Sequence, residues 1–411
     1  MNIAQKLIWK QSTIFSAIIT KKEGKKMKKG LMIVLSLVLI FGIVGLGHSA
    51  DVKKGIHVGN AGAFTGDAAA PCMEIYNSSQ IAVDEWNAKG GIQGVEIKHI
   101  MGDDAMDPAQ GVNVAHKFVA DELMYGVVGP PMSHIAQATL KIYGAADMAS
   151  ITTAASKPDL TEQGYKHFFR VNARNDAHGW NCALFMKQNL KAKRVAILNE
   201  KTAYNVNMAK ETIAGLKKLG ITDIMQETIV AGAKDYSAVL TKVKAFKPDV
   251  LFFVATTAPD CAIGVRQAKE LGIKAIFFGT EGARDKNDFI KAAEGAAEGA
   301  YVYHFAPDIY SISEAAEYVK KYESTYEVLS GFGPPAYEAM NILLSAIDKA
   351  AADGDITRQE VLQSLQKTEN YKGILGFPVT FDAKGDLKGG ATYFFQVVGN
   401  DFKQVAVMTG K

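Results

Sequence analysis

VLFFVATTAPDCAIGVRQAKELGIKAIFFGTEGA, residues 250–283, contains a complete strand–helix–strand pattern. VLFFVA and AIFFG are continuous apolar runs of strand length, and the segment from Asp260 to the stop at Gly272 has helical spacing. Strands that are apolar at every position are buried on both faces, which is typical of a parallel sheet covered by helices. This stretch therefore predicts an α/β fold built on a parallel sheet.

The same alternation of strands and helices extends in both directions from this stretch. It begins near Gly55, restarts near Asn172 and breaks after Tyr301. Apolar or alternating runs typical of strands begin near residues 56, 95, 124, 149, 194 and 227. The sequence thus predicts two α/β halves of comparable size.

A different pattern follows the second half. Three helical segments are expected at 313–329, 336–352 and 357–368, and the residues from 378 to 408 read as short strands separated by turns. Thr357 and Glu360 have the spacing of a capping box, which places a helix start there.

The N-terminus has the pattern of a secretory signal peptide. Lys28-Lys29-Gly30 is followed by the apolar run LMIVLSLVLIFGIVGLG and by small residues before Asp51, which predicts cleavage near residue 50 and export from the cytoplasm. Met27 would itself open a normal signal peptide, so residues 1–50 are interpreted as a signal peptide with an over-long start. An uncleaved membrane anchor is the alternative.

Composition narrows the class of protein. The 411 residues carry a formal charge of +3, but residues 1–50 hold eight lysines and one glutamate, so the remainder has a charge of −4. With 48% hydrophobic and 22% charged residues, the chain is typical of a soluble globular protein with two domains. No basic patch is interleaved with aromatic residues, so no nucleic-acid partner is expected. Three cysteines do not make a disulfide scaffold, and the pairing of Cys182 with Cys261 stays open.

Common catalytic and cofactor motifs are missing from the sequence. We find no phosphate-binding loop, no dinucleotide fingerprint, no zinc-protease motif and no nucleophile elbow. Asp103, Asp104 and Asp107 have the appearance of a metal cluster, but we interpret them as loop acids with Asp107 as a helix N-cap. The sequence therefore predicts no cofactor, no metal and no catalytic residue, and an enzyme with Glu281 as general base is kept as an alternative.

Candidate ligand-binding residues follow the predicted strands, because open α/β sheets bind ligands beyond the carboxyl ends of their strands. Ser133 is expected in the first turn of a helix, where unpaired N–H groups and the helix dipole favour a carboxylate. Ser156 follows another strand of the first half, and Tyr204 and Glu281 follow strands of the second half. Anion-binding groups would then face a carboxylate, which matches the two charges of an amino acid.

Structural roles are the alternative for each of these residues. Ser133 and Ser156 could be simple helix caps, Glu281 could be a solvated loop residue, and Tyr204 could be a packing residue. Spacing alone does not decide between these interpretations.

The stretches AVDEWNAKGGIQG, YGVVGPPMSHIAQA, SKPDLTEQGYKHFFR, FFGTEG and FDAKGDLKGG carry a family resemblance. From Val52 to about Val405 the chain resembles a periplasmic branched-chain amino-acid-binding protein of the leucine/isoleucine/valine type. The resemblance implies the type I periplasmic-binding fold, with two doubly wound parallel-sheet lobes joined by three hinge crossovers near Asn172, Tyr303 and Leu387. It assigns residues 51–172 and 304–387 to an N-terminal lobe and residues 173–303 and 388–411 to a C-terminal lobe.

The resemblance also implies roles for individual residues. Serine residues of such proteins hold the ligand carboxylate, and a glutamate in a G-x-E-G turn holds the ammonium group. In this sequence the implied ligand-binding residues are Ser133, Ala154, Ala155, Ser156, Tyr204, Thr256 and Glu281.

Several positions depart from the family pattern. Pro71, Thr256 and Thr257 stand where the family often has aromatic residues, and Met106 and Met132 stand where it often has a disulfide. The resemblance therefore implies an amino acid or a close analogue more firmly than it implies leucine.

The implied function is that of a periplasmic, monomeric substrate-binding component of an ABC importer. It would capture an amino acid, branched-chain or otherwise apolar, and deliver it to a membrane permease. The alternatives are a binding protein for a small amide or carboxylic acid, and a soluble partner of a ligand sensor. The chain ends at Lys411 without a second membrane span or output domain, which we interpret as evidence against a single-chain receptor.

Overall fold

The structure, a computed structural model, describes residues 50–326 and 329–409. Apart from Ala50, the predicted signal peptide lies outside the described residues. Within the described part of the chain, no helix combines the length and the apolar character needed to cross a membrane.

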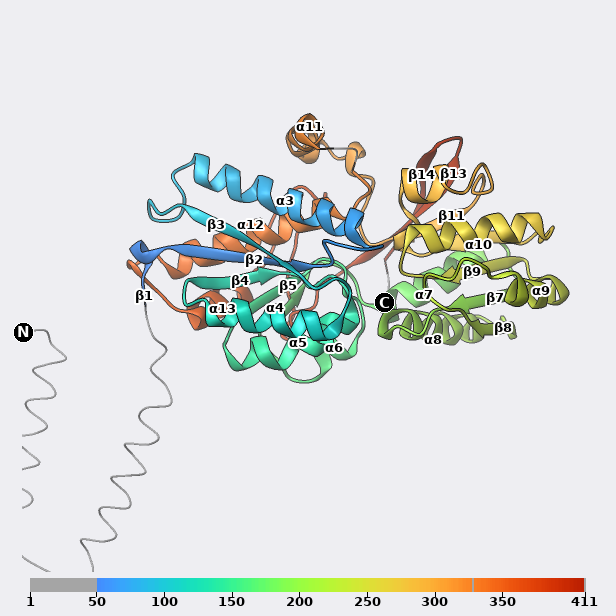
Figure 1. The fold of residues 1–411 in the computed structure, drawn as a ribbon, viewed down its shortest axis with the longest axis horizontal. Coiled ribbons are helices and arrows are strands. Elements are labelled where there is room, and N and C mark those ends of the chain that lie inside the picture. Colours follow the sequence, from blue (N-terminus) through green and yellow to red (C-terminus); the bar gives the residue numbers. More distant parts are fainter. Residues whose placement is uncertain (1–49, 327–328, 410–411) are drawn as a thin grey trace, which may run out of the picture. The chain divides into compact units, whose positions relative to one another are not determined.

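One sheet has five strands, all parallel, in the order β3-β2-β4-β5-β6 (Figure 1). Its strands are β2 (Ile56–Gly62), β3 (Ile97–Asp103), β4 (Met124–Val128), β5 (Ala149–Thr152) and β6 (Phe168–Arg170). The helices between them are α3 (Ala69–Ala88), α4 (Pro108–Ala120), α5 (Ser133–Ala145) and α6 (Asp159–Glu162). In Figure 1, α3 lies on one face of this sheet and α4 and α5 lie on the other.

The other large sheet has seven strands in the order β14-β13-β11-β10-β9-β7-β8. Its strands are β7 (Arg194–Asn199), β8 (Asp223–Thr228), β9 (Val250–Val254), β10 (Ile276–Gly279), β11 (Tyr301–His304), β13 (Ala391–Val398) and β14 (Asp401–Thr409). The first five in chain order are parallel, whereas β13 pairs antiparallel with both β11 and β14. The C-terminal strands expected from the sequence therefore form an antiparallel hairpin on the edge of a parallel sheet.

Paired phenylalanines show how this second sheet is covered on both faces. Phe253 and Phe277 pack in one core with α9 (Ser237–Phe246) and α10 (Ala258–Glu270). Their neighbours Phe252 and Phe278 pack in another core with α7 (Asn175–Gln188) and α8 (Ala203–Lys218). Because successive side chains of a strand point to opposite faces, each pair gives one ring to each core. The prediction of a sheet buried on both sides is confirmed.

Helices that follow β11 return to the first sheet. α12 (Gly333–Ala350) and α13 (Arg358–Gln366) share one core with β2, β4 and β5, and Thr357 and Glu360 form the predicted capping box. The segment from 313 to 329 is shorter than expected, since its helix α11 spans Ala316–Thr325. The short elements are β1 (Ala50–Asp51), β12 (Asp355–Ile356), the 3-10 turns Val52–Lys54, Glu281–Ala283, Ile309–Ser311 and Ser313–Ala315, and a π-helical turn at Lys286–Lys291.

The chain passes between the two large sheets three times. It leaves the five-stranded sheet after β6, returns after β11, and leaves again between Leu387, which packs on the core of the first sheet, and β13. Two α/β sheets joined by three passages agree with the expected fold class. The exact lobe boundaries at residues 172, 303 and 387 stay predictions.

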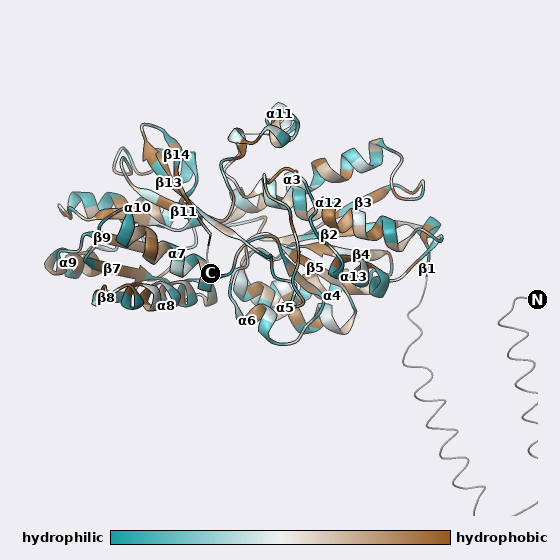
Figure 2. Cartoon of the chain, turned by 180° about the vertical axis from the view of Figure 1, so that it is seen from behind, coloured by the Kyte–Doolittle hydropathy of each residue, from teal (hydrophilic) through white to brown (hydrophobic). Residues whose placement is uncertain are grey.

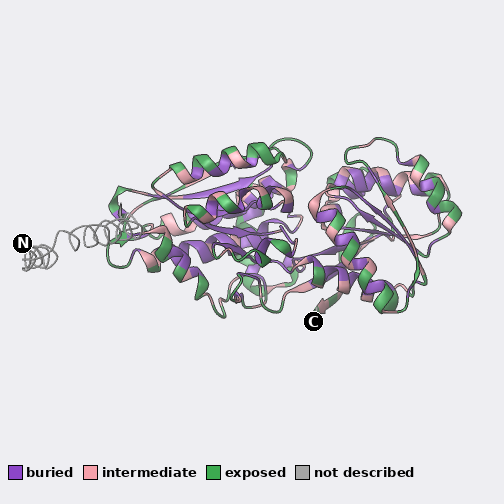
Figure 3. Cartoon of the chain, turned by 90° about the horizontal axis from the view of Figure 1, so that it is seen from below, coloured by how far each residue is buried: buried purple, intermediate pink, exposed green. Residues whose placement is uncertain are grey.

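Hydropathy and burial follow this architecture. The strands are mostly brown in Figure 2, and the helices carry teal residues on their outer sides. Figure 3 shows the same division, with purple strands and helices whose outer faces are green. The apolar positions that the sequence arranges in strands and on one side of each helix therefore form the cores.

Candidate functional site

A cleft that is partly open to solvent is lined by residues from loops of both large sheets. The loops of the five-stranded sheet contribute Ser133 and Ala154, and those of the seven-stranded sheet contribute Tyr204, Thr256 and Glu281. Five of the seven predicted site residues therefore line one cleft. Ala155 and Ser156 are buried beside it without lining it.

Ser133 is the first residue of α5 and is 2% exposed. No side chain caps this helix, because its N-cap residue is Met132. The N–H groups of its first turn are therefore free of side-chain partners at the cleft wall. The Ser133 hydroxyl accepts a hydrogen bond from the Lys157 N–H at 3.3 Å, which leaves its own proton available to a ligand. Ser133 is thus placed to bind an anion and does not cap the helix.

Ser156 is placed differently from what the sequence suggested. Its hydroxyl donates to Asn175 Oδ1 at 2.6 Å, and the Asn175 N–H donates to the Ser156 carbonyl at 2.8 Å. Asn175 is the first residue of α7. The Ser156 side chain therefore binds Asn175, which lies in the first passage of the chain between the sheets. Only the backbone N–H of Ser156 is left for a ligand.

Glu281 follows β10 and ends a short chain of hydroxyl groups. Tyr204 donates to Glu281 Oε2 at 2.5 Å, and the hydroxyls of Tyr204 and Tyr303 lie 2.6 Å apart. Tyr204 is therefore a direct partner of the carboxylate as well as a packing residue. Gly282, which follows Glu281, lies so close to Thr256 that a Cβ atom there would be 2.2 Å from the Thr256 carbonyl oxygen. Glycine at this position allows the turn that presents Glu281.

Burial raises the pKa of the Glu281 carboxyl, and the hydrogen bonds from Tyr204 and Tyr303 partly oppose that rise. Burial, together with the nearby Glu281 carboxylate, raises the pKa of both tyrosines well above the ordinary value. Among the described residues, no lysine, arginine or histidine forms an ion pair with Glu281. The cleft therefore contains an acid whose ionised form lacks a protein cation, and a ligand cation would supply it.

Thr256 lies over a second buried acid that the sequence did not reveal. Its hydroxyl donates to Glu200 Oε2 at 2.8 Å, and Asn205 Nδ2 donates to the same oxygen at 2.6 Å. Burial raises the pKa of Glu200 to about 7, against these hydrogen bonds. Thr256 thus separates Glu200 from the cleft. Asn205 stabilises the same Glu200 carboxyl by its hydrogen bond.

The sequence did not predict several residues that line the cleft, Phe332 and Arg284 among them. Phe332 precedes α12 and contacts Phe305 edge to face, with ring centroids 5.4 Å apart. It supplies an aromatic wall that Pro71, Thr256 and Thr257 do not. Arg284 is 6% exposed and lies 4.0 Å from the Phe395 ring centroid, and its Nη1 has no hydrogen-bond partner among the described residues. Only two features of the sequence could have indicated these residues. They are the aromatic residue in GFGPP and the arginine three positions after Glu281.

Other expectations concern residues around the cleft. Met106 and Met132 pack against the same small apolar cluster, where a disulfide was expected to be replaced by apolar contact. Asp107 caps α4, as predicted. Cys72, Cys182 and Cys261 are all free and buried, and the last two lie in separate cores, so they do not pair.

Comparison with known proteins agrees with this geometry. The family described as periplasmic binding protein matches residues 55–402. A Leu/Ile/Val-binding protein homologue of Brucella abortus is 33% identical over 362 residues, which cover 88% of this chain and 94% of that protein.

Solved structures share the fold. A leucine-binding protein of Thermotoga maritima has a TM-score of 0.79 at 24% identity, covering 86% of this chain and 98% of that one. A branched-chain amino acid transporter substrate-binding protein of Streptococcus pneumoniae, in complex with isoleucine, has a TM-score of 0.77 at 23% identity, covering 86% and 99%. On the family match and the Brucella relative, the chain belongs to the periplasmic binding protein family.

Proposed function

We propose that this protein captures an amino acid with an apolar side chain outside the cytoplasm and delivers it to the membrane permease of an ABC importer. The observation that carries the proposal is the opposition of charges in the cleft. The uncapped start of α5 with Ser133 suits a carboxylate, and Glu281 without a protein cation suits an ammonium group.

The side-chain part of the ligand would contact apolar walls. Those walls comprise Pro71, Ile75, Met132, Ala154, Pro259 and Phe332. The Brucella relative is named for binding leucine, isoleucine and valine, which supports the same ligand class. We expect the protein to act as a monomer, to be exported by the predicted signal peptide, and to bind without catalysis.

A second candidate ligand is a small amide or carboxylic acid that lacks the amine. The raised pKa of Glu281 supports this alternative, because a protonated Glu281 could hydrogen-bond an uncharged group. An ionised Glu281 facing an uncharged ligand would be unpaired, which costs on the order of several kcal/mol.

A thermal-shift screen separates these ligands. The exported protein would be stripped of ligand by unfolding and refolding, then tested with the common L-amino acids and with their deaminated acids and amides. A ligand at a hundred times its Kd stabilises the fold by roughly 2.7 kcal/mol. Shifts confined to amino acids with apolar side chains support the proposal, shifts only with amine-free compounds support the alternative, and no shift with any compound contradicts both.

A further inference from the structure

The loop of residues 154–157 follows β5 and reaches the cleft at Ala154. All four of its backbone carbonyl oxygens accept hydrogen bonds that hold the loop in place. Asn172 Nδ2 donates to the Ala154 carbonyl at 3.3 Å, and the Asn175 N–H donates to the Ser156 carbonyl at 2.8 Å. Arg170 Nη1 donates to the carbonyls of Ala155, at 2.9 Å, and Lys157, at 3.2 Å. These donors lie between residues 170 and 175, at the end of β6 and in the first passage between the sheets. The Lys157 carbonyl also accepts from the Leu160 N–H at 3.3 Å.

Holding the carbonyls in this way leaves N–H groups for a ligand. The N–H groups of Ala155 and Lys157 donate to Thr152 Oγ1 and Ser133 Oγ. Those of Ala154 and Ser156 have no acceptor among the described residues. Unpaired backbone N–H groups in one loop form an anion-binding concavity, and this loop lies beside the free start of α5 through the Lys157–Ser133 hydrogen bond.

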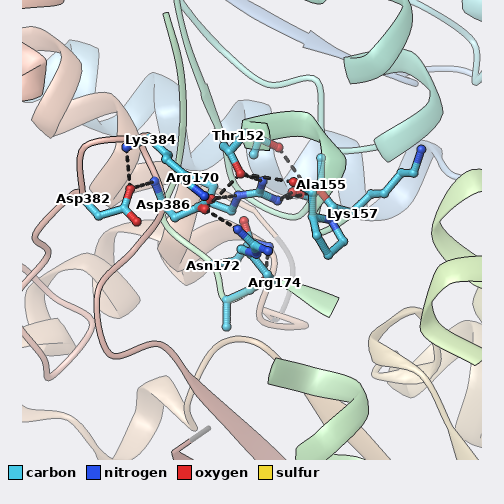
Figure 4. A network of polar contacts seen from close by, with 12 residues as sticks. Thr152, Ala155, Lys157, Arg170, Asn172, Arg174, Asp382, Lys384 and Asp386 are labelled. Atoms are coloured by element: carbon cyan, nitrogen blue, oxygen red, sulfur yellow. Dashed lines mark hydrogen bonds and ion pairs between the residues drawn. The ribbon is translucent and has the colours of Figure 1, made fainter. Parts of the chain in front are cut away.

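Arg170 is itself fixed by a fully buried network. It is 0% exposed, and its Nε donates to Asp386 Oδ1 at 2.6 Å. Its Nη2 donates to Thr161 Oγ1 at 2.9 Å, and that hydroxyl donates to Asp386 Oδ2 at 2.9 Å. Figure 4 shows Arg170 between Asp386 and the carbonyls of Ala155 and Lys157. The Arg170 guanidinium thus donates hydrogen bonds to one carboxylate, one hydroxyl and two carbonyls of the loop.

The acid end of this network belongs to a distant part of the sequence. Asp386 precedes Leu387, where the chain makes its third passage, and its Oδ2 also accepts from Arg174 Nη1 at 2.9 Å. The Arg170 N–H donates to the Gly385 carbonyl at 3.0 Å. The first and third passages are therefore joined at Arg170, directly behind the loop.

We propose that Arg170 is a positioning residue, which Asp386 holds in place so that the 154–157 loop presents its free N–H groups to the carboxylate of the ligand. The inference rests on the proposed function, because it needs a ligand with a carboxylate. It gives the FDAKGD segment a role in binding although none of its residues lines the cleft.

The test compares L-leucine with L-leucinamide, which keeps the ammonium group and side chain but lacks the carboxylate. Arg170→Lys keeps a cation beside Asp386, yet its single amine cannot reproduce the fork that reaches Asp386 and two carbonyls. Calorimetry should show at least about tenfold weaker binding of L-leucine, while the Kd of L-leucinamide changes by less than about threefold.

Two further variants keep the test decisive. Asn172→Ala removes the hydrogen bond to the Ala154 carbonyl and leaves the Arg170–Asp386 ion pair intact. It should weaken the binding of L-leucine by about threefold or more. Leu343→Ala lowers stability in the core of the same sheet, away from the cleft, and should leave both Kd values unchanged. If Arg170→Lys does not fold, Asn172→Ala carries the test.

Each result has one meaning. Selective loss of L-leucine binding supports the positioning role. Equal weakening of both compounds, or an unchanged Kd for L-leucine in a destabilised variant, overturns it while the proposed function stands. If the wild-type protein binds neither compound, the amino-acid proposal fails and the inference fails with it.

Discussion

Glu281 shows how a single side chain links binding to stability. Its side chain is half-buried in the cleft wall and forms no ion pair with a described residue, so burial makes its ionised form less favourable than in water. A ligand ammonium would reverse this effect. Relative to water, we therefore expect the ligand-free fold to raise the pKa of this carboxyl and the proposed complex to lower it again.

We predict that Glu281→Gln abolishes tight binding of an amino acid and stabilises the ligand-free protein at pH 7 to 8. Wild-type binding should also release protons, because the complex lowers a pKa that burial had raised. Calorimetry in two buffers of different ionisation enthalpy measures the release. Glu338→Gln, which changes another buried carboxyl outside the cleft, should bind normally. Unchanged affinity in Glu281→Gln would exclude the ammonium-partner role.

In the proposed complex, Ser133 contacts the carboxylate at the other end of the ligand. We predict that Ser133→Ala weakens amino-acid binding by about 1–3 kcal/mol, for the loss of a charge-assisted hydrogen bond. Isothermal titration with L-leucine measures this loss. Ser79→Ala removes a buried hydroxyl of α3 that has no partner among the described residues, and its Kd should match that of the wild type. Equal affinities for all three proteins would refute the contact.

At the scale of one element, we propose that the start of α5 brings the positive end of the helix dipole to the ligand carboxylate. A helix without an N-cap side chain keeps its first N–H groups for an external anion. Met132 occupies the cap position, and a half-buried apolar residue there cannot compete with the ligand.

We predict that Met132→Asp reduces L-leucine binding at least about tenfold relative to Met132→Asn, since both supply a cap but only aspartate adds a negative charge at the helix start. Both variants lose the packing of the Met132 side chain, so the difference between their Kd values measures the effect of the negative charge. Binding of L-leucinamide, which has no carboxylate, should not fall in the aspartate variant. Equal losses in both variants would show that packing, not charge, decides.

Elements differ in how well the sequence predicts them. Strands such as 250–254 and helices with clear caps, such as Asp107 and Thr357, were predictable because their signals are local. The positions of Ser133 and Glu281 at the cleft were also predictable, since both come within a few residues of the end of a strand. The roles of Ser156 and Arg170 were not, because their partners Asn175 and Asp386 come from segments that only the folded chain brings together. Phe332 was missed for the same reason.

Across the whole molecule, buried acids and buried histidines oppose each other in pH dependence. Burial raises the pKa of Glu200 and Glu338 to about 7 and that of Asp104 to about 6. These groups stabilise the fold at low pH and lose that contribution as the pH rises from about 4 to 7. Burial lowers the pKa of His167 and His178 to about 4. Their contribution is present above about pH 6.5 and is lost as the pH falls toward 4.

We therefore predict that the stability of the ligand-free protein changes little between pH 5 and 7. Glu338→Gln removes one acid from this balance, so its stability relative to the wild type should rise with pH across that range. Urea unfolding midpoints at pH 5, 6 and 7 provide the measurement. If the stability difference between the variant and the wild type stays constant or falls with pH, the pKa of the Glu338 carboxyl is not raised by burial.

The three free cysteines have a practical consequence. All are buried, and burial raises the pKa of Cys72 to about 12 and those of Cys182 and Cys261 well above the ordinary value. Because the thiolate is the reactive form, we expect these buried thiols to react much more slowly with alkylating reagents in the folded protein than an exposed thiol would. One cysteine introduced at the exposed cleft residue Asp67 would be the sole labelling point. The native chain is therefore ready to become a fluorescent reporter of its own ligand without any cysteine being removed.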